Sequence, residues 1–157
     1  MAWYDLRDDT FIRKNKIMAN FETLTAAQPR IDVKLSGTQA IANNTSTAIA
    51  FNSETYDPNG DYTTDTWTCP EDGVYLITSN LWFANNATGF REIGVYLDAA
   101  LQEMVRIEAS AAYDYNQIVS ILDLSATNTI QIKARQTSGG DLNVGVSSTL
   151  KIVKLSS

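Results

Sequence analysis

The segment from Phe51 to Ile77 reads FNSETYDPNGDYTTDTWTCPEDGVYLI and alternates turn signals with strand signals. The pentapeptide Tyr56–Gly60 combines an Asp that can hydrogen bond to its own backbone, a Pro that fixes φ and a Gly that accepts positive φ. It therefore predicts a tight reversal. Aromatic residues among threonines predict a half-buried strand from Asp61 to Cys69, and the turn Pro70–Gly73 leads into an apolar strand. The segment predicts two strands separated by a turn.

From Ile31 to the end of the chain, every signal is a short strand bounded by turn residues. Alternating apolar and polar residues, or short apolar runs, predict these strands, and no helical periodicity interrupts them. This spacing is typical of a β-sandwich or barrel. Besides the strand from Asp61 to Cys69, the predicted strands cover residues 31–35, 47–51, 73–84, 90–97, 101–107, 118–124, 129–135 and 150–155.

The opening segment also resembles the central signature of the C1q-like domain, in which an N…YD…G…Y motif leads into an aromatic, a Pro and a G-x-Y strand. The residues that carry the resemblance are Phe51-Asn52, Tyr56-Asp57, Gly60, Tyr62, Trp67, Pro70, Gly73 and Tyr75. The resemblance can be followed from about Ile31 to Leu155. It implies an all-β, antiparallel jelly-roll sandwich whose first and last strands lie side by side.

Two loops depart from the pattern of that family. Asp98-Ala99-Ala100 replaces an Asn-Gly turn, and Ala126-Thr127-Asn128 replaces a Gly-Asp before a late strand. We expect these loops to differ in shape from those of the family, and any ligand site that the family builds there is not carried over.

Residues 1–30 lack the strand pattern of the rest of the chain. They are predicted to form a short N-terminal helical arm, with residues 31–157 as the head. Ile17, Phe21 and Leu24 fall in one stripe of a helix of about four turns between Thr10 and Thr25. The stripe is too short for a self-sufficient coiled coil. The helix either packs on its own head or anchors the chain at a symmetry axis or on a larger assembly, and the aromatic residues ahead of it favour anchoring. The expected anchoring residues are Trp3, Tyr4, Leu6, Ile17, Phe21 and Leu24.

Length and composition exclude several classes of protein. A chain of 157 residues with 44% hydrophobic content suits one buried domain with an appendage. No apolar run approaches the roughly 18 residues of a membrane helix, and no signal peptide is evident, so neither membrane insertion nor secretion is expected. Residues 37–157 hold six basic against thirteen acidic residues. Such a head repels a phosphate backbone, which argues against nucleic-acid binding.

The side chains needed for the commonest hydrolase chemistries are missing. The chain has one cysteine and no histidine, so it can form neither an internal disulfide nor a Ser-His or Cys-His pair. We expect Cys69 to be a small buried hydrophobe, with a reactive or intersubunit role as the alternative. We expect no cofactor and no enzymatic activity.

Acidic residues crowd the stretch between Glu54 and Asp72. Asp57 to Asp61 begins like a calcium loop, but Tyr62 and Thr68 stand where a Gly and a bidentate Glu are required. C1q-like heads sometimes bind calcium, yet solvated turn residues are the better interpretation, and no metal site is predicted. Paired carboxylates could serve a glycosidase only across a cleft, which the sequence does not reveal.

The aromatic residues are too numerous for one sandwich core, and neighbours such as Trp82 and Phe83 must point to opposite faces. A symmetric interface would hide the surplus. The resemblance implies a trimer around an axis lined by aromatic side chains. The candidate trimer-interface residues are Tyr56, Tyr75, Trp82 and Tyr96, and Tyr113 and Tyr115 are candidate ligand residues in a head loop.

These features together predict a non-enzymatic, homotrimeric virion protein, a head decoration or fibre that is anchored on a bacteriophage capsid by its N-terminal arm. One alternative is a tail-fibre tip or host-recognition module that binds a surface glycan or protein through residues 84–89, 109–116 and 137–143. The other is a cellular C1q-like binding protein, against which the missing secretion signal argues.

Overall fold

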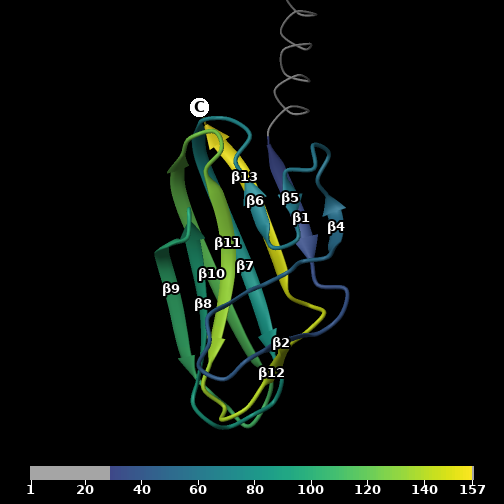
Figure 1. The fold of residues 1–157 in the computed structure, drawn as a ribbon, viewed down its shortest axis with the longest axis vertical. Helices are drawn as coiled ribbons and strands as arrows, with labels where there is room; N and C mark the ends of the chain where they lie inside the picture. The colour runs from purple at the N-terminus through teal and green to yellow at the C-terminus, as the bar shows by residue number, and fades with distance from the viewer. Residues whose placement is uncertain (1–28, 157) are drawn as a thin grey trace, which may run out of the picture.

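A computed structural model of the chain describes residues 29–156, which form two packed antiparallel β-sheets (Figure 1). The predicted all-β sandwich is confirmed. The arm helix between Thr10 and Thr25 and the six anchoring residues lie outside the described residues. The seven-stranded sheet contains β1 (Arg30–Lys34), β2 (Gln39–Ile41), β4 (Ser53–Tyr56), β7 (Gly73–Phe83), β10 (Asp114–Leu124), β12 (Leu142–Val144) and β13 (Thr149–Ser156). The six-stranded sheet contains β3 (Thr47–Ala48), β5 (Tyr62–Thr63), β6 (Thr66–Thr68), β8 (Phe90–Leu97), β9 (Ala100–Glu108) and β11 (Thr129–Gln136).

The first and last strands lie side by side, as predicted. Strand β1 pairs with β13 along its whole length, from Arg30 opposite Val153 to Lys34 opposite Thr149. Strand β13 in turn pairs with β7, and β7 pairs with β10, which forms one edge of the seven-stranded sheet. Every strand pairing is antiparallel, so the chain crosses the sandwich repeatedly from end to end.

The core lies between the two sheets because side chains alternate along each strand. In β7 the odd-numbered residues from Gly73 to Phe83 point inward and are buried, whereas the even-numbered ones face outward, with Asn80 the most exposed. Trp67 and Tyr75 are fully buried and their rings meet edge to face with centroids 5.2 Å apart. Burial of side chains of this size contributes about 1.5–3 kcal/mol each.

The predicted reversal at Tyr56–Gly60 is confirmed. Gly60 has a φ of 70°, which a side chain would disfavour. The Asp57 carboxylate folds back onto the backbone, where Oδ1 accepts from the N–H of Asp61 at 3.1 Å and Oδ2 from that of Tyr62 at 3.0 Å. The single strand predicted from Asp61 to Cys69 is wrong: a turn with Thr64 at a φ of 56° divides it into β5 and β6.

Three short strands were not predicted from the sequence, namely β2, β4 and β12. They have three or four residues each and pair with other strands at the sheet margins. Strand β10 begins at Asp114 rather than at Ile118, so Asn116 and its two predecessors belong to a strand and not to a loop.

The sandwich has two distinct ends. At the end that we call proximal, β1 begins and β13 ends, and the backbone N–H of Lys154 donates to the carbonyl of Pro29. At the opposite, distal end, Figure 1 shows β2 and β12. The distal end also carries the loops of residues 84–89, 109–113 and 137–141, since β7, β9 and β11 all run toward it. No helix among the described residues could cross a membrane.

Candidate functional site

The outer face of the seven-stranded sheet carries apolar side chains on three adjacent strands, exposed on β10 and half-buried on β7 and β13. Leu76 of β7 lies opposite Ile121 of β10 on one side and Val153 of β13 on the other, which forms an apolar row across the sheet. Ile121 and Val119 are 61% and 50% exposed at the sheet edge. Contiguous exposed apolar surface is common where a protein contacts another molecule. We call this surface the proximal patch; its residues are Tyr56, Leu76, Val119, Ile121 and Val153.

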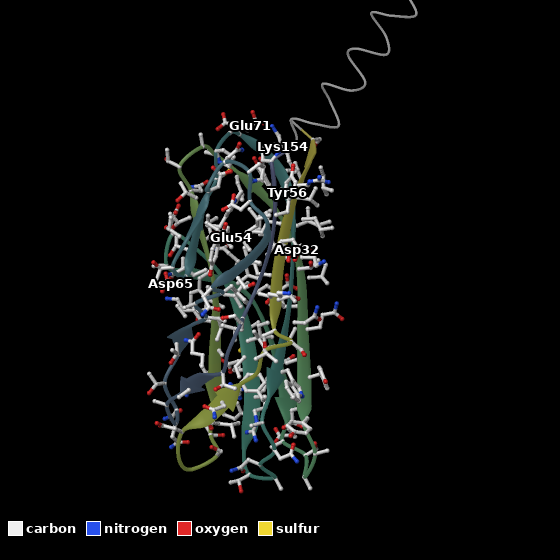
Figure 2. All side chains as sticks on the ribbon, turned by 90° about the vertical axis from the view of Figure 1, so that its right-hand side faces the viewer. Asp32, Glu54, Tyr56, Asp65, Glu71 and Lys154 are labelled. Atoms are coloured by element: carbon white, nitrogen blue, oxygen red, sulfur yellow. The ribbon has the colours of Figure 1, made fainter. Side chains whose placement is uncertain are left out.

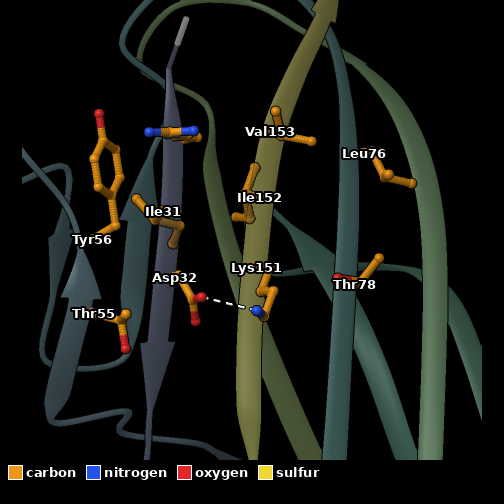
Figure 3. Close-up of a pocket in the computed structure, with 10 residues that line it drawn as sticks. Ile31, Asp32, Thr55, Tyr56, Leu76, Thr78, Lys151, Ile152 and Val153 are labelled. Carbon is orange, nitrogen blue, oxygen red and sulfur yellow. Dashed lines mark hydrogen bonds and ion pairs between the residues drawn. The ribbon is translucent and has the colours of Figure 1, made fainter. Parts of the chain in front are cut away.

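Beside the exposed β10 edge, the proximal patch is hollowed over β1, β7 and β13, with a volume of about 480 Å³ (Figure 3). The guanidinium of Arg30 lies over the Tyr56 ring, 4.1 Å from its centroid. Lys151 Nζ and Asp32 Oδ2 form an ion pair at 2.8 Å in the hollow. Leu76 and Val153 provide its apolar wall. The face thus offers a projecting apolar edge and an apolar hollow rimmed by paired charges.

A polar row separates the proximal patch from the distal end of the same face. Asn80 of β7 lies opposite Gln117 of β10 and Thr149 of β13, and both amide side chains are exposed. The apolar surface is therefore interrupted and does not run the length of the sheet.

Beyond this row lies a group of three aromatic rings, Trp82, Tyr113 and Tyr115, which we call the distal aromatic cluster. The Trp82 ring centroid lies 4.6 Å from that of Tyr113 and 6.0 Å from that of Tyr115. The two tyrosines are 53% and 67% exposed.

The four predicted interface residues do not gather on one surface. Tyr56 and Trp82 lie on the outer face of the seven-stranded sheet. Tyr75 is fully buried and donates its hydroxyl to the carbonyl of Glu71, so its assignment to an interface is wrong. Tyr96 lies in β8 of the six-stranded sheet, where the ammonium of Lys133 sits 4.5 Å from its ring centroid.

The structure brings the candidate ligand residues Tyr113 and Tyr115 together, but Tyr115 lies on β10 and not in a loop. Sequence reasoning missed Leu76, Val119, Ile121 and Val153. A signal for them was present, because residues 118–124 read IVSILDL, with apolar residues at positions of both faces. A strand with two apolar faces is covered on both.

The acidic residues between Glu54 and Asp72 are spread out. Figure 2 shows Glu54, Asp65 and Glu71 at separate levels along the sandwich. Glu71 forms an ion pair with the buried Lys154 at 2.7 Å. No cluster of three or more His, Cys, Asp or Glu side chains that could hold a metal occurs among residues 29–156.

Several buried hydroxyl and thiol groups are held in a protonated, hydrogen-bonded state. Burial raises the pKa of Tyr62, whose hydroxyl donates to the carbonyl of Ile49 at 3.2 Å. Burial also raises the pKa of Cys69, which is 1% exposed and donates to the carbonyl of Glu71, so the prediction of a small buried residue is confirmed. A protonated buried thiol is a poor nucleophile.

A buried ion pair fixes two distal loops. Arg91 Nε lies 3.3 Å from Asp114 Oδ2, and both side chains are almost fully buried. The guanidinium donates to the carbonyls of Thr88 and Asn86 in the loop of residues 84–89. Asp114 Oδ1 accepts from the N–H and the hydroxyl of Ser110 in the loop of residues 109–113.

No family model and no curated protein sequence matches the chain. Solved structures with the same fold do match it. The Eiger TNF of S. frugiperda superposes with a TM-score of 0.63 at 14% identity, covering 82% of this chain and 93% of that one. The globular domain of zebrafish complement 1qA gives a TM-score of 0.60 at 14% identity, with coverages of 79% and 94%. Murine APRIL at pH 8.0 gives 0.65 at 14% identity, with coverages of 82% and 99%. The chain has the antiparallel jelly-roll fold of the TNF and C1q globular domains.

Proposed function

We propose that this chain forms a non-enzymatic homotrimeric head that a bacteriophage virion displays, with residues 1–30 as the anchor on the capsid. The proximal patch carries the proposal, because Val119 and Ile121 project from a sheet edge beside a hollow that Leu76 and Val153 line. An edge and a hollow on one subunit allow a heterologous contact that closes into a ring. The resemblance of residues 51–77 to the C1q-like signature, together with the fold shared with TNF and C1q globular domains, favours three subunits.

The attachment point of the proposed anchor and the distal loops lie at opposite ends of the head, which supports display on a larger assembly. Pro29, near the end of the proposed anchor, is bound at the proximal end, whereas the loops around Arg91 and Asp114 lie at the distal end. An anchored head would therefore present these loops outward, where exposed loops on a rigid scaffold commonly bind partners.

The trimer is tested by light scattering on the full chain. We expect the wild-type mass to be three times the 17.3 kDa of one chain. Ile121→Asp places a charge in the proposed contact and is expected to give monomers with an unchanged β-sheet circular dichroism spectrum. Gln117→Asp is the matched control, since Gln117 is an exposed outward residue of the same strand in the polar row. A monomeric wild type, or an Ile121→Asp protein that stays trimeric, would contradict the proposed contact.

The virion location is tested by immunogold electron microscopy with antibodies against the head. Label on the capsid of phage particles is the expected result. Label at the tail would instead support a tail-fibre tip, and label on cells without particles would support a cellular C1q-like protein.

A further inference from the structure

A second hollow opens beside the distal aromatic cluster, with a volume of about 200 Å³. It is set apart from the proximal patch by the polar row of Asn80, Gln117 and Thr149. Pockets for drug-sized ligands begin at about 300 Å³, so this hollow admits one small ring. The residues that line it are Thr38, Trp82, Ala84, Tyr113, Asn143 and Gly145.

The indole of Trp82 forms a fixed wall of this hollow. Gly145 lies directly against its six-membered ring, so that a Cβ at this position would overlap Cε3 and Cζ3. The backbone on both sides is held as well, because the N–H of Gly145 donates to the Trp82 carbonyl at 2.7 Å and the N–H of Trp82 to Ser148 Oγ at 3.0 Å. The ring is therefore oriented before any ligand binds, which lowers the entropic cost of binding.

Tyr113 forms a second, exposed wall next to Trp82, with the two ring centroids 4.6 Å apart, and is positioned by the loop of residues 109–113. Asp114, the next residue, accepts from the N–H of Ser110 at 3.1 Å and from its hydroxyl at 2.7 Å. Asp114 is itself paired with the buried Arg91. This network closes the loop and holds the Tyr113 ring over Trp82.

The chemistry of the lining selects a class of ligand. Aromatic faces are electronegative and attract the polarised C–H bonds of a sugar ring, while the exposed Asn143 amide and Thr38 hydroxyl can hydrogen bond to its hydroxyl groups. No charged side chain lines the hollow, which disfavours an acidic sugar. Trp82 Nε1 is a buried donor without a partner among residues 29–156. We propose that this hollow and the distal aromatic cluster bind a single uncharged pyranose unit of a saccharide.

The experiment is an NMR titration of the full chain with methyl glycosides of glucose, galactose and N-acetylglucosamine, and with N-acetylneuraminic acid as the charged comparison. The chain has three tryptophans, so the indole N–H signals are few. We expect a saturable shift of the Trp82 signal with at least one neutral glycoside. Trp67 is fully buried in the core and serves as the internal control that should not move.

Two variants test the walls of the hollow. Tyr113→Ala removes an exposed ring and is expected to weaken binding about tenfold, and Gly145→Ala displaces the indole and is expected to weaken it similarly. Tyr96→Ala, on the outer face of the other sheet, is the control and should bind like the wild type. The molar mass of each variant is also measured by light scattering.

Each other outcome would overturn the saccharide site. No Trp82 shift with any neutral glycoside, or a shift unchanged in Tyr113→Ala, would exclude it. A loss of the trimer in Tyr113→Ala would make the cluster a subunit contact instead. Because Ile121→Asp tests the trimer separately, failure of one proposal leaves the other standing.

Discussion

The carboxylate of Asp98 binds the first residue of β11: its Oδ1 accepts from the backbone N–H of Thr129 at 2.7 Å and from the Thr129 hydroxyl at 3.0 Å. Oδ2 accepts from the side-chain amide of Asn128 at 2.7 Å. The turn between β8 and β9 is thereby tied to the turn before β11. These hydrogen bonds, that from the Thr129 backbone foremost, lower the pKa of Asp98.

This lowered pKa predicts acid sensitivity at the proximal end. When the folded-state pKa lies below the unfolded value of about 3.9, the stabilisation is complete above that value and is lost as the pH falls through the folded pKa. Asp98→Asn keeps an acceptor oxygen but does not ionise. We expect the wild-type melting temperature to fall more steeply than that of Asp98→Asn between about pH 5 and pH 2. If the melting temperatures of the two proteins fall in parallel with pH, the carboxylate charge contributes nothing to stability.

Replacing Ala99 by glycine is expected to stabilise the head. Asp98 and Ala99 have φ values of 47° and 68°, the left-handed pair of a two-residue type I′ hairpin turn, in which Asn-Gly or Asp-Gly is preferred. The strain on a left-handed alanine exceeds the entropy cost of glycine, so Ala99→Gly should add about 0.5–1 kcal/mol to the free energy of unfolding. Urea titration measures it. Ala100→Gly is the control: Ala100 is in β9, and a glycine there should destabilise.

Much of the fold could be predicted from the sequence because most strands are long and alternate clearly. Strand β8 was predicted to the residue, since Phe90–Leu97 follows Gly89 and ends at the turn of Asp98 and Ala99. The strands β2, β4 and β12 could not be predicted, because three or four residues show too little periodicity and their pairing depends on distant partners. The left-handed turn at Ala99 was also hidden, because tertiary hydrogen bonds to Asp98 support it.

The candidate site was only partly predictable, because β7 is apolar on both faces. Val74 and Leu76 alternate with Tyr75 and Ile77, so the sequence does not say which set enters the core. Tyr75 was assigned to the interface as one of a surplus of aromatic residues, although it is buried, and Leu76 was missed although it lies on the outer face. The pairing of Trp82 with Tyr113 required the register of β10 on β7.

Two tyrosines on opposite faces of the seven-stranded sheet should respond differently to loss of the hydroxyl. Tyr75 donates to the Glu71 carbonyl at 2.9 Å from within the core, so Tyr75→Phe is expected to lower the free energy of unfolding by about 1 kcal/mol. Tyr56 lies on the outer face under Arg30, and Tyr56→Phe should change it by less than about 0.5 kcal/mol. Urea unfolding at one protomer concentration compares them, and equal effects would contradict the buried position of Tyr75.

The ion pair of Arg91 and Asp114 is expected to be the most sensitive polar contact of the distal end. Burial lowers the pKa of Arg91, while the charge of Asp114 opposes that shift and keeps the guanidinium charged. Arg91→Met leaves a buried carboxylate without its counter-charge and frees the carbonyls of Thr88 and Asn86. The expected loss in the free energy of unfolding is about 3–5 kcal/mol. Asp32→Asn breaks the exposed pair with Lys151 and should cost less than about 1 kcal/mol.

A double-mutant cycle separates the pair from the rest of the network. Asp114→Asn retains an acceptor for Ser110 but removes the charge, so it isolates the ionic part of the contact. If the two charges compensate each other, the Arg91→Met, Asp114→Asn double variant is destabilised by less than the sum of the two single variants. Additive losses would mean that Arg91 acts mainly through its hydrogen bonds to the loop carbonyls. In that case, Arg91→Met should reduce protection against hydrogen exchange in the loop of residues 84–89 alone.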